Sequence, residues 1–288
     1  MEDFKKYLQA QKLKSSTVEE HSKNVGYFTQ WLKQEGYDTG TTIQYADLLG
    51  YIQFEKEKGI TPATINLRLS SIKYYFEYLK SIGEVVKNPA KTIRVKGTIN
   101  TIIENPLSTP ELEILYQQYA QLAVPDHLLM IHKRSIVILG LMIWQGVHSG
   151  ELQKMEISHI DLNNASVYIP STSQSNSRQI SIHSKQLLSL HEYVSTIRLL
   201  LKPKGNELIA GSVRNHVQRV LQEIQGINPM IRNAQQIRGS VIINWLKQHS
   251  KRQVQYMAGH KYISSTEKYE QQEIDSLKDV LSKHHPFG

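Results

Sequence analysis

The chain has 288 residues, 34 Lys+Arg against 26 Asp+Glu, and a formal net charge of +8. This length fits roughly two domains, and the absence of cysteine from the sequence excludes disulfides, thiolate metal sites and a cysteine nucleophile. The longest apolar stretch, 135–147, is shorter than the ~20 residues that a membrane span needs, and the N-terminal residues lack the apolar core of a secretion signal. We therefore expect a soluble, cytoplasmic protein without a membrane segment and with a polyanion as candidate partner.

The positive charge is spread along the chain. Divided near residue 98, the sequence has 15 basic and 11 acidic residues before that point and 19 and 15 after it, so each part carries +4. Two basic folded parts favour a polyanionic ligand that is gripped from both sides. Ordinary solubility explains the same charge equally well.

The first part of the chain has the start signals and apolar spacing of helices. Ser-Thr-Val-Glu at 16–19 fits a capping box, and the helix that it opens ends at Gly36. Thr61 and Pro62 supply a cap and a first-turn proline before an apolar stripe at 65–79. Two helices are predicted from these signals.

A third helix is predicted between them, through the apolar residues of 48–54. No segment of this part alternates like a strand, so a helical bundle is expected over 1–95. Residues 96–107 lack helical periodicity and contain Gly97 and Pro106, which is typical of a linker.

The second part, 108–288, reads as a mostly helical domain with a small β-hairpin. A capping box at 108–111 opens its first helix, and the nearly all-apolar segment 135–144 predicts a buried central helix. Short β-branched and aromatic runs at 167–169 and 180–182 surround a Ser/Asn/Gln turn. The fold class expected for the whole chain is therefore mainly α.

Common motifs for nucleotide and metal chemistry are missing from the sequence. It contains no P-loop, GxGxxG, HExxH or GxSxG pattern, and its twelve histidines are scattered without metal-ligand spacing. We expect neither a cofactor nor a metal site.

The informative stretch is 235–271. Arg238 stands at the front of an apolar helical run, Gly259 and His260 follow a second short helix, and Tyr269 comes nine residues after His260. This arrangement resembles the tyrosine recombinase (phage integrase) family, in which an H-x-x-R element opens one helix, a G-H dipeptide ends a later one, and the tyrosine nucleophile follows nine residues on.

The N-terminal part resembles the helical core-binding domain of the same family through TPATINLRLSSIKYYFEYLKSIG and Asn88-Pro89. The resemblance thus covers nearly the whole chain and implies a DNA-binding domain at 1–95, a catalytic domain at 108–288 and double-stranded DNA as partner. Three basic residues of the first domain are candidate contacts to the DNA backbone: Arg68, Lys73 and Lys80. A solvent-exposed helix face explains each of them equally well.

The resemblance also implies a chemistry. The phenol of Tyr269 attacks a DNA phosphodiester and forms a 3′-phosphotyrosyl link, so that neither a metal nor a nucleotide is required. Arg238 is then the phosphate clamp, because its guanidinium donates paired charge-assisted bonds, and His260 is a hydrogen-bond donor to the phosphate.

Several positions depart from the family pattern. His148 stands where the family has its first arginine, Glu151 is kept as local support, and Gln235 replaces the histidine of H-x-x-R. The hairpin has no lysine between 170 and 180, and Ser173 lies near the place of the family's lysine. The substitutes that we consider are the imidazolium of His148, the amide of Gln235, and the side chains of Lys185, Lys133 and Arg134.

Two functions are compatible with this pattern. The first is an integrase of a mobile element that breaks and rejoins DNA; the alternative is a cleavage-impaired relative that serves as a DNA-binding accessory subunit. An apolar stripe within 273–287 predicts a tail helix, through which the chain would assemble on DNA as a multimer, with itself or with a related recombinase. An unrelated basic binding protein is the weaker third interpretation.

Overall fold

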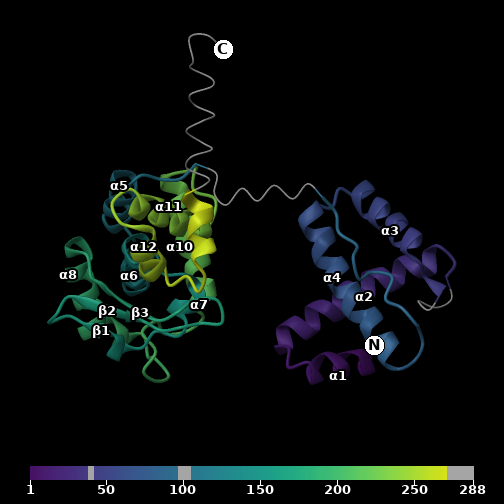
Figure 1. Ribbon diagram of the computed structural model, residues 1–288. Helices are drawn as coiled ribbons and strands as arrows, with labels where there is room; N and C mark the ends of the chain where they lie inside the picture. Colours follow the sequence, from purple (N-terminus) through teal and green to yellow (C-terminus); the bar gives the residue numbers. More distant parts are fainter. Residues whose placement is uncertain (38–41, 97–104, 271–288) are drawn as a thin grey trace, which may run out of the picture. The chain divides into compact units, whose positions relative to one another are not determined.

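A computed structural model of the chain describes residues 1–37, 42–96 and 105–270, and it divides into two compact units, Met1–Asn100 and Thr101–Gly288 (Figure 1). The predicted linker at 96–107 falls largely on 97–104 and the predicted tail helix on 273–287, both outside the described residues. Each unit is considered by itself below.

The first unit is the helical bundle that the sequence predicts. Its described helices are α1 (Glu2–Ala10), α2 (Ser15–Gln34), α3 (Tyr45–Glu57) and α4 (Pro62–Ser81). The start of α4 is confirmed, because the Thr61 hydroxyl accepts the Thr64 N–H at 3.4 Å and Pro62 opens the first turn. Aromatic side chains of α2, α3 and α4 fill the core, among them Phe28, Tyr51 and Phe76.

The capping box predicted at 16–19 is wrong. Helix α2 begins at Ser15, two residues earlier than a box with Ser16 as N-cap predicts, and its N-cap Lys14 makes no side-chain cap. The carboxylate of Glu19 instead accepts the Lys5 ammonium of α1 at 3.1 Å. An ion pair with a helix that the sequence did not reveal therefore replaces the local cap.

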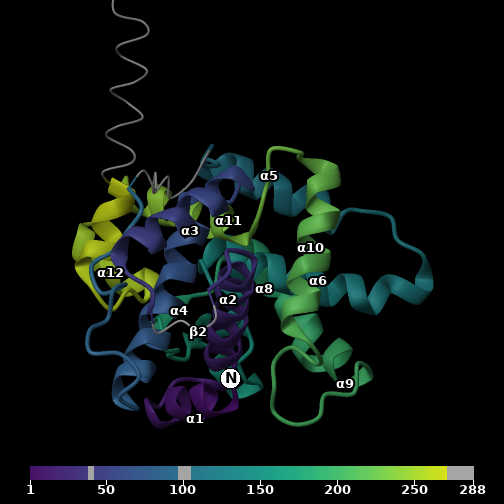
Figure 2. The same ribbon diagram turned by 90° about the vertical axis from the view of Figure 1, so that its right-hand side faces the viewer.

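The second unit is built around a buried helix, α6. Its described helical segments are α5 (Thr109–Ala120), η2 (Asp126–Leu128), α6 (Leu129–Trp144), α7 (Ser149–Leu152), η3 (Ile157–His159), α8 (Ser184–Glu192), η4 (Tyr193–Ile197), α9 (Arg198–Leu200), α10 (Val213–Ile227), α11 (Ala234–Leu246), α12 (Lys251–Ala258) and a last run at 263–270. Helices α5, α8, α10 and α11 all contact α6, and Figure 2 shows α10 lying against it.

Helix α6 confirms the buried segment predicted at 135–144, because every residue from Ser135 to Ile143 is buried. The span Asp126–Trp144 is long and apolar enough to cross a membrane, but 61% of its most apolar 18 residues are buried inside the protein. Its apolar character is therefore that of a core helix. The capping box of α5 is also confirmed, with the Ser108 N–H donating to Glu111 at 2.7 Å.

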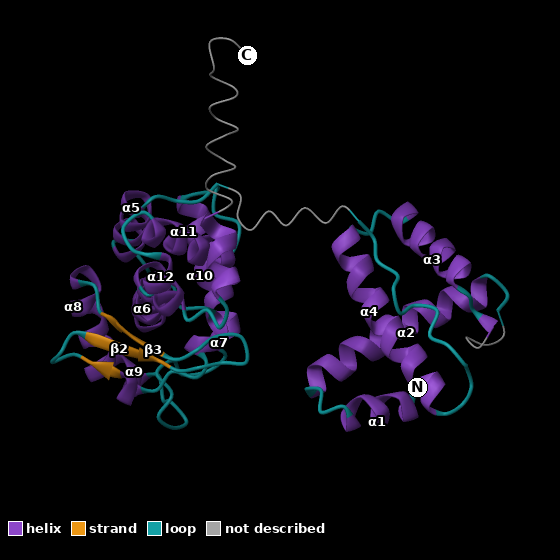
Figure 3. Cartoon of the chain, viewed as in Figure 1, coloured by secondary structure: helices purple, strands orange, loops and turns teal. Residues whose placement is uncertain are grey.

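A three-stranded antiparallel sheet in the order β1-β2-β3 completes the unit, drawn in orange in Figure 3. Its strands are β1 (Ile160–Asp161), β2 (Ser166–Ile169) and β3 (Arg178–Ser181). The predicted hairpin is confirmed, but β3 begins two residues before the expected 180–182. Arg178 pairs with Ile169 in the last register position of the hairpin and is buried. A buried carboxylate partner compensates the charge of its guanidinium.

Candidate catalytic site

A single buried carboxylate links several elements of the second unit. Glu151, in α7, is completely buried. It accepts two bonds from Arg178 of β3, at 2.5 and 3.2 Å, and a third from Arg238 of α11 at 3.3 Å. The sheet, α7 and α11 are thereby tied together at one point.

Arg178 is the residue of this cluster that the sequence reasoning missed. Its side chain is fully buried, and its Nε has no hydrogen-bond partner. A signal was available, since residues two apart on a strand share a face and Arg178 alternates with the half-buried Ile180. A lone arginine on the inward face of a strand indicates a buried counter-charge.

The charges of this cluster do not balance. Burial raises the pKa of Glu151, but the hydrogen bonds and charge of Arg178, together with the charges of Arg238 and His148, outweigh burial and hold that pKa at about 2. The carboxylate is therefore ionised at neutral pH and stands against two guanidinium groups. A surplus of one positive charge at a largely buried position favours an anionic ligand.

Arg238 stands at the front of α11, as predicted, and is partly accessible, with 13% of its side chain exposed. Besides Glu151, its guanidinium donates to the carbonyl of Gly146 and, at 2.6 Å, to that of Ala258. These bonds join the end of α6, the start of α11 and the end of α12. The guanidinium is thus held in place by bonds to three segments, and the side chain keeps a small exposed fraction.

His260 and Tyr269 lie together, with their ring planes 9° from parallel and their centroids 5.8 Å apart. The imidazole Nδ1 is 2.8 Å from the hydroxyl of the buried Thr266, which fixes the ring. Gly259, directly before His260, ends α12 in the left-handed region at φ +68°. A Cβ there would lie 2.5 Å from the guanidinium of Arg178, so this position requires glycine for two reasons.

The environment sets the protonation of both rings. Burial, then the charges of Arg238 and Arg178, lower the pKa of His260 to about 4. Burial raises the pKa of the Tyr269 phenol, and the charge of Arg238 opposes that shift. At neutral pH the imidazole is therefore uncharged and the phenol keeps its proton.

His148, which we considered above as an imidazolium, is held as an uncharged ring. It is the N-cap of α7, and its Nδ1 accepts the N–H groups of Gly150 at 3.0 Å and Glu151 at 3.3 Å. Burial is the largest of the causes that lower the pKa of His148. The ring is thus neutral with its proton on Nε2, a buried atom without a hydrogen-bond partner and 3.6 Å from the Glu151 carboxylate.

Of the remaining residues considered as substitutes, Gln235 lies on the helix of Arg238, and the three cations are bonded elsewhere. Gln235 is exposed on the first turn of α11, three residues before Arg238, which places it on the same side of the helix. The three cations considered as replacements are bonded to other partners: Lys185 to Glu113, Lys133 to Glu192, and Arg134 to His216 and Ala210.

In the first unit, the candidate DNA contacts differ from one another. Arg68 forms an ion pair with the buried Glu55 and lies 4.6 Å from the ring centre of Tyr27. Lys73 is half-buried, and Lys80 is exposed at the end of α4. Arg68 therefore has a structural partner, whereas Lys80 reaches solvent.

The polar turn of the hairpin lies on the segment that carries His260. Ser175 forms an isolated antiparallel bridge with His260, and the Asn176 N–H donates to the Gly259 carbonyl at 2.8 Å. Ser175 is itself buried. The polar hairpin turn is therefore anchored on one side to the segment that carries His260.

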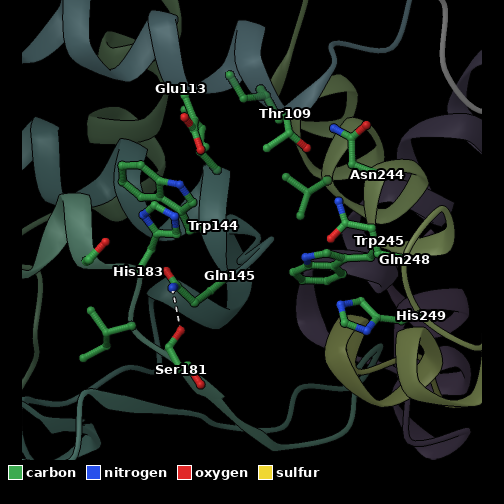
Figure 4. A pocket seen from close by; sticks show the side chains of 15 residues that line it. Thr109, Glu113, Trp144, Gln145, Ser181, His183, Asn244, Trp245, Gln248 and His249 are labelled. Atoms are coloured by element: carbon green, nitrogen blue, oxygen red, sulfur yellow. Dashed lines mark hydrogen bonds between the residues drawn. The ribbon is translucent and has the colours of Figure 1, made fainter.

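A cavity of about 410 Å³ lies elsewhere in the unit, between the ends of α6 and α11 and the start of α8 (Figure 4). On one wall the Trp144 ring stacks on His183 at 4.8 Å, and the Gln145 amide donates to the Ser181 carbonyl at 3.0 Å; Trp245 lies across from them. None of the charged cluster lines this cavity. Within the described residues, no group of three or more His, Cys, Asp or Glu could hold a metal.

The chain matches two known protein families. Residues 1–83 match the phage integrase N-terminal SAM-like domain, and residues 107–275 match the phage integrase family. These matches confirm the resemblance given by the motifs, and the mainly helical fold class is confirmed as well.

Relatives and solved structures agree with these matches. Tyrosine recombinase XerC of Bacillus pumilus is 25% identical over 98% of this chain and 95% of its own length, and XerC of Escherichia coli O157:H7 is 24% identical over 99% and 96%. A XerH recombinase in a post-cleavage complex with a palindromic difH substrate has a TM-score of 0.76 at 16% identity, over 92% of this chain and 79% of that one. A lambda integrase dimer bound to a COC′ core site has 0.69 at 16%, over 93% of each chain.

Proposed function

Because this chain belongs to the phage integrase family of tyrosine recombinases, we propose that it breaks and rejoins double-stranded DNA through a 3′-phosphotyrosyl intermediate on Tyr269, as the integrase of a mobile element. The observation that carries the proposal is the placement of the Tyr269 phenol beside His260 and next to a cluster with one surplus positive charge. The solved relatives bound to their DNA substrates support the choice of ligand.

In the cleavage step, the Tyr269 oxygen attacks the phosphorus and the bond to the 5′ oxygen breaks. Negative charge builds up on the non-bridging oxygens, and fixed donors stabilise it most effectively in a site that excludes water. Arg238, whose side chain is partly accessible, supplies charge-assisted bonds to these oxygens. The neutral His260 ring adds an uncharged N–H donor, because the Thr266 hydroxyl occupies its Nδ1. His148 supports this step indirectly, because its Nδ1 caps α7 and its buried Nε2 faces the Glu151 carboxylate.

Arg178 affects this step indirectly, through Glu151 and Gly259. Its side chain is fully buried, so it is a positioning residue and does not touch the DNA. It neutralises Glu151, which leaves the charge of Arg238 available for the phosphate, and it packs beneath Gly259, directly before His260. We infer that this arginine carries the charge that His148 does not.

The rival function, an accessory subunit that binds DNA without cleaving it, is favoured by one observation. The first arginine of the family pattern is His148, which is held neutral as a helix cap. The presence of Arg178 on the same carboxylate favours the active enzyme instead, because the cluster still contains two guanidinium groups.

We further infer how the chain engages DNA. The domain at 1–95 and the domain at 108–288 would grip the duplex from two sides, in keeping with the +4 charge of each part of the sequence. Subunits would assemble on DNA through the apolar stripe within 273–287, with another copy or a related recombinase; the lambda integrase structure is itself a dimer on its core site. The reaction would take place in the cytoplasm.

The test is a covalent-adduct assay. The full chain is incubated with nicked duplexes drawn from the DNA that flanks its gene, and the products are separated on a denaturing gel. We expect a DNA-shifted protein band that Tyr269→Phe abolishes and that the matched control Tyr262→Phe retains, since Tyr262 is 73% exposed in the same segment. Salt-sensitive binding of the same DNA without any adduct would favour the accessory function.

A further inference from the structure

The proposed cleavage step also requires a general acid that protonates the leaving 5′ oxygen. An alkoxide is a poor leaving group, so the 5′ oxygen needs a proton as its bond to phosphorus breaks. Guanidinium groups do not give up protons in proteins, which excludes Arg178 and Arg238. His260 and His148 carry only the proton of a neutral imidazole, because burial lowers the pKa of each. The hairpin turn between Pro170 and Arg178 contains only hydroxyl and amide side chains.

Two lysines that are not part of this turn donate hydrogen bonds to its backbone. The Lys261 ammonium donates to the Ser173 carbonyl at 2.9 Å, and the Lys154 ammonium donates to the Ser171 carbonyl at 2.8 Å. All four residues are exposed. Each lysine is thus held by a bond that a DNA oxygen could replace at little cost, since exposed hydrogen bonds contribute only about 1 kcal/mol.

The two lysines differ in their relation to the reacting group. Lys261 directly follows His260, whose ring stacks on Tyr269, and consecutive Cα atoms are only about 3.8 Å apart. The backbone just before it is fixed to the turn by the Ser175–His260 bridge and the Asn176–Gly259 bond. Lys154 follows the short helix α7 and lies outside this paired segment.

We propose that Lys261 is the general acid of the reaction, an assignment that rests on the proposed function. Its ammonium gives one proton to the 5′ oxygen as the phosphorus–oxygen bond breaks and the bond from the Tyr269 oxygen to phosphorus forms, while the phenolic proton passes to water. In rejoining, the neutral amine takes a proton from the attacking 5′ hydroxyl, the phosphotyrosyl bond breaks, and the phenol regains a proton from water. The flexible four-carbon stem of lysine suits a donor that moves from the Ser173 carbonyl to the DNA.

The experiment compares two nicked duplexes that differ in one atom. In the first the scissile linkage ends in the natural 5′ oxygen, and in the second this bridging oxygen is sulfur, whose thiolate leaves without a proton because thiols are far stronger acids than alcohols. We expect Lys261→Ala in the full chain to form adduct about 10²–10⁴-fold more slowly on the oxygen duplex. On the sulfur duplex it should match the unmodified chain.

Two further variants separate proton donation from charge and from binding to the turn. Lys261→Arg keeps the charge without a proton that it can donate, so it should be as slow as Lys261→Ala on the oxygen duplex and unimpaired on the sulfur duplex. Lys154→Ala removes the neighbouring ammonium on the same turn and should cleave both duplexes at close to the unmodified rate.

Equal losses on both duplexes would overturn the assignment, because they would show a structural or binding role. Unchanged cleavage of the oxygen duplex by Lys261→Ala would overturn it while leaving the proposed function intact. If the unmodified chain forms no adduct on either duplex, the proposed function itself fails and the assignment falls with it.

Discussion

Each unit of the molecule buries one glutamate against arginine, and the two sites differ in charge balance. In the first unit Glu55, 2% exposed, pairs with Arg68, and the pair is neutral. In the second unit Glu151, fully buried, stands between Arg178 and Arg238. The second site therefore has one negative and two positive charges, a surplus of one positive charge.

The difference indicates what each site is for. A neutral buried pair leaves no net charge, and the Glu55 pair joins α3 to α4. Burying an additional charge costs stability, because desolvation is only partly recovered by the partner. The second arginine at Glu151 is therefore hard to explain by folding alone, and the phosphate of the proposed DNA substrate would complete the charge balance.

The largest effect on stability is expected from Glu151→Gln. This change leaves two guanidinium groups without a counter-charge, and we expect the second unit to lose about 3–5 kcal/mol of unfolding free energy. Urea unfolding of the full chain can be followed by tryptophan fluorescence in a Trp31→Phe background, where the remaining tryptophans, Trp144 and Trp245, both report on the second unit.

The matched control is Glu55→Gln in a Trp144→Phe/Trp245→Phe background, in which the emission of Trp31 reports on the first unit. Only one guanidinium loses its partner there, and Arg68 keeps 16% of its side chain exposed and the Tyr27 ring beside it. The first unit should therefore lose clearly less than the second. Equal losses in the two units would contradict the argument from charge balance.

A smaller contrast is expected in acid. Burial is the largest of the causes that lower the pKa of four histidines in the second unit, His132, His148, His216 and His260, and of His21 in the first. A base with a lowered folded pKa binds its proton more readily when unfolded. Its contribution to stability is thus complete above the unfolded pKa of about 6.5 and is lost as the pH falls towards the folded pKa, which is about 4 for His260.

Urea midpoints of the two units measured from about pH 7 to about pH 5 check this expectation. The second unit should weaken more steeply than the first, which has only His21 within residues 1–100. Parallel slopes would show that the buried histidines of the second unit do not stay neutral.

The elements that local signals define were predictable from the sequence. Thr61 with Pro62, and Ser108 with Glu111, mark helix starts that the structure confirms. The signal at 16–19 failed: α2 already begins at Ser15, and Glu19 pairs with Lys5 of α1, fourteen residues away. Strand β1 was missed because its two residues are too few to show alternation.

The part of the site that lies in one local stretch of sequence was predictable as well. The spacing of Arg238, His260 and Tyr269 belongs to one continuous stretch, and the structure brings the three together. The contacts of Glu151 join residues 27 and 87 positions apart, and no local pattern reveals such pairings. The neutral state of His148 also follows from a cap and from burial, which residue type alone does not give.

Replacing Arg238 by methionine, with Arg68→Met as the counterpart in the neutral pair, shows whether the surplus charge at Glu151 serves DNA. Adduct formation on nicked DNA and the unfolding free energy of each unit are measured for both variants. Arg238→Met should slow adduct formation by at least about 10²-fold. It should change the stability of the second unit by about 2 kcal/mol or less, because the lost hydrogen bonds are offset by the removal of a surplus charge.

Arg68→Met should do the reverse, destabilising the first unit while adduct formation on bound DNA proceeds at close to the unmodified rate. Two results would contradict a role of the surplus charge in DNA cleavage: normal adduct formation by Arg238→Met, or a loss of stability in the second unit as large as that of Glu151→Gln. Either result would make the second guanidinium a structural partner of Glu151, and the surplus charge would then not be reserved for DNA.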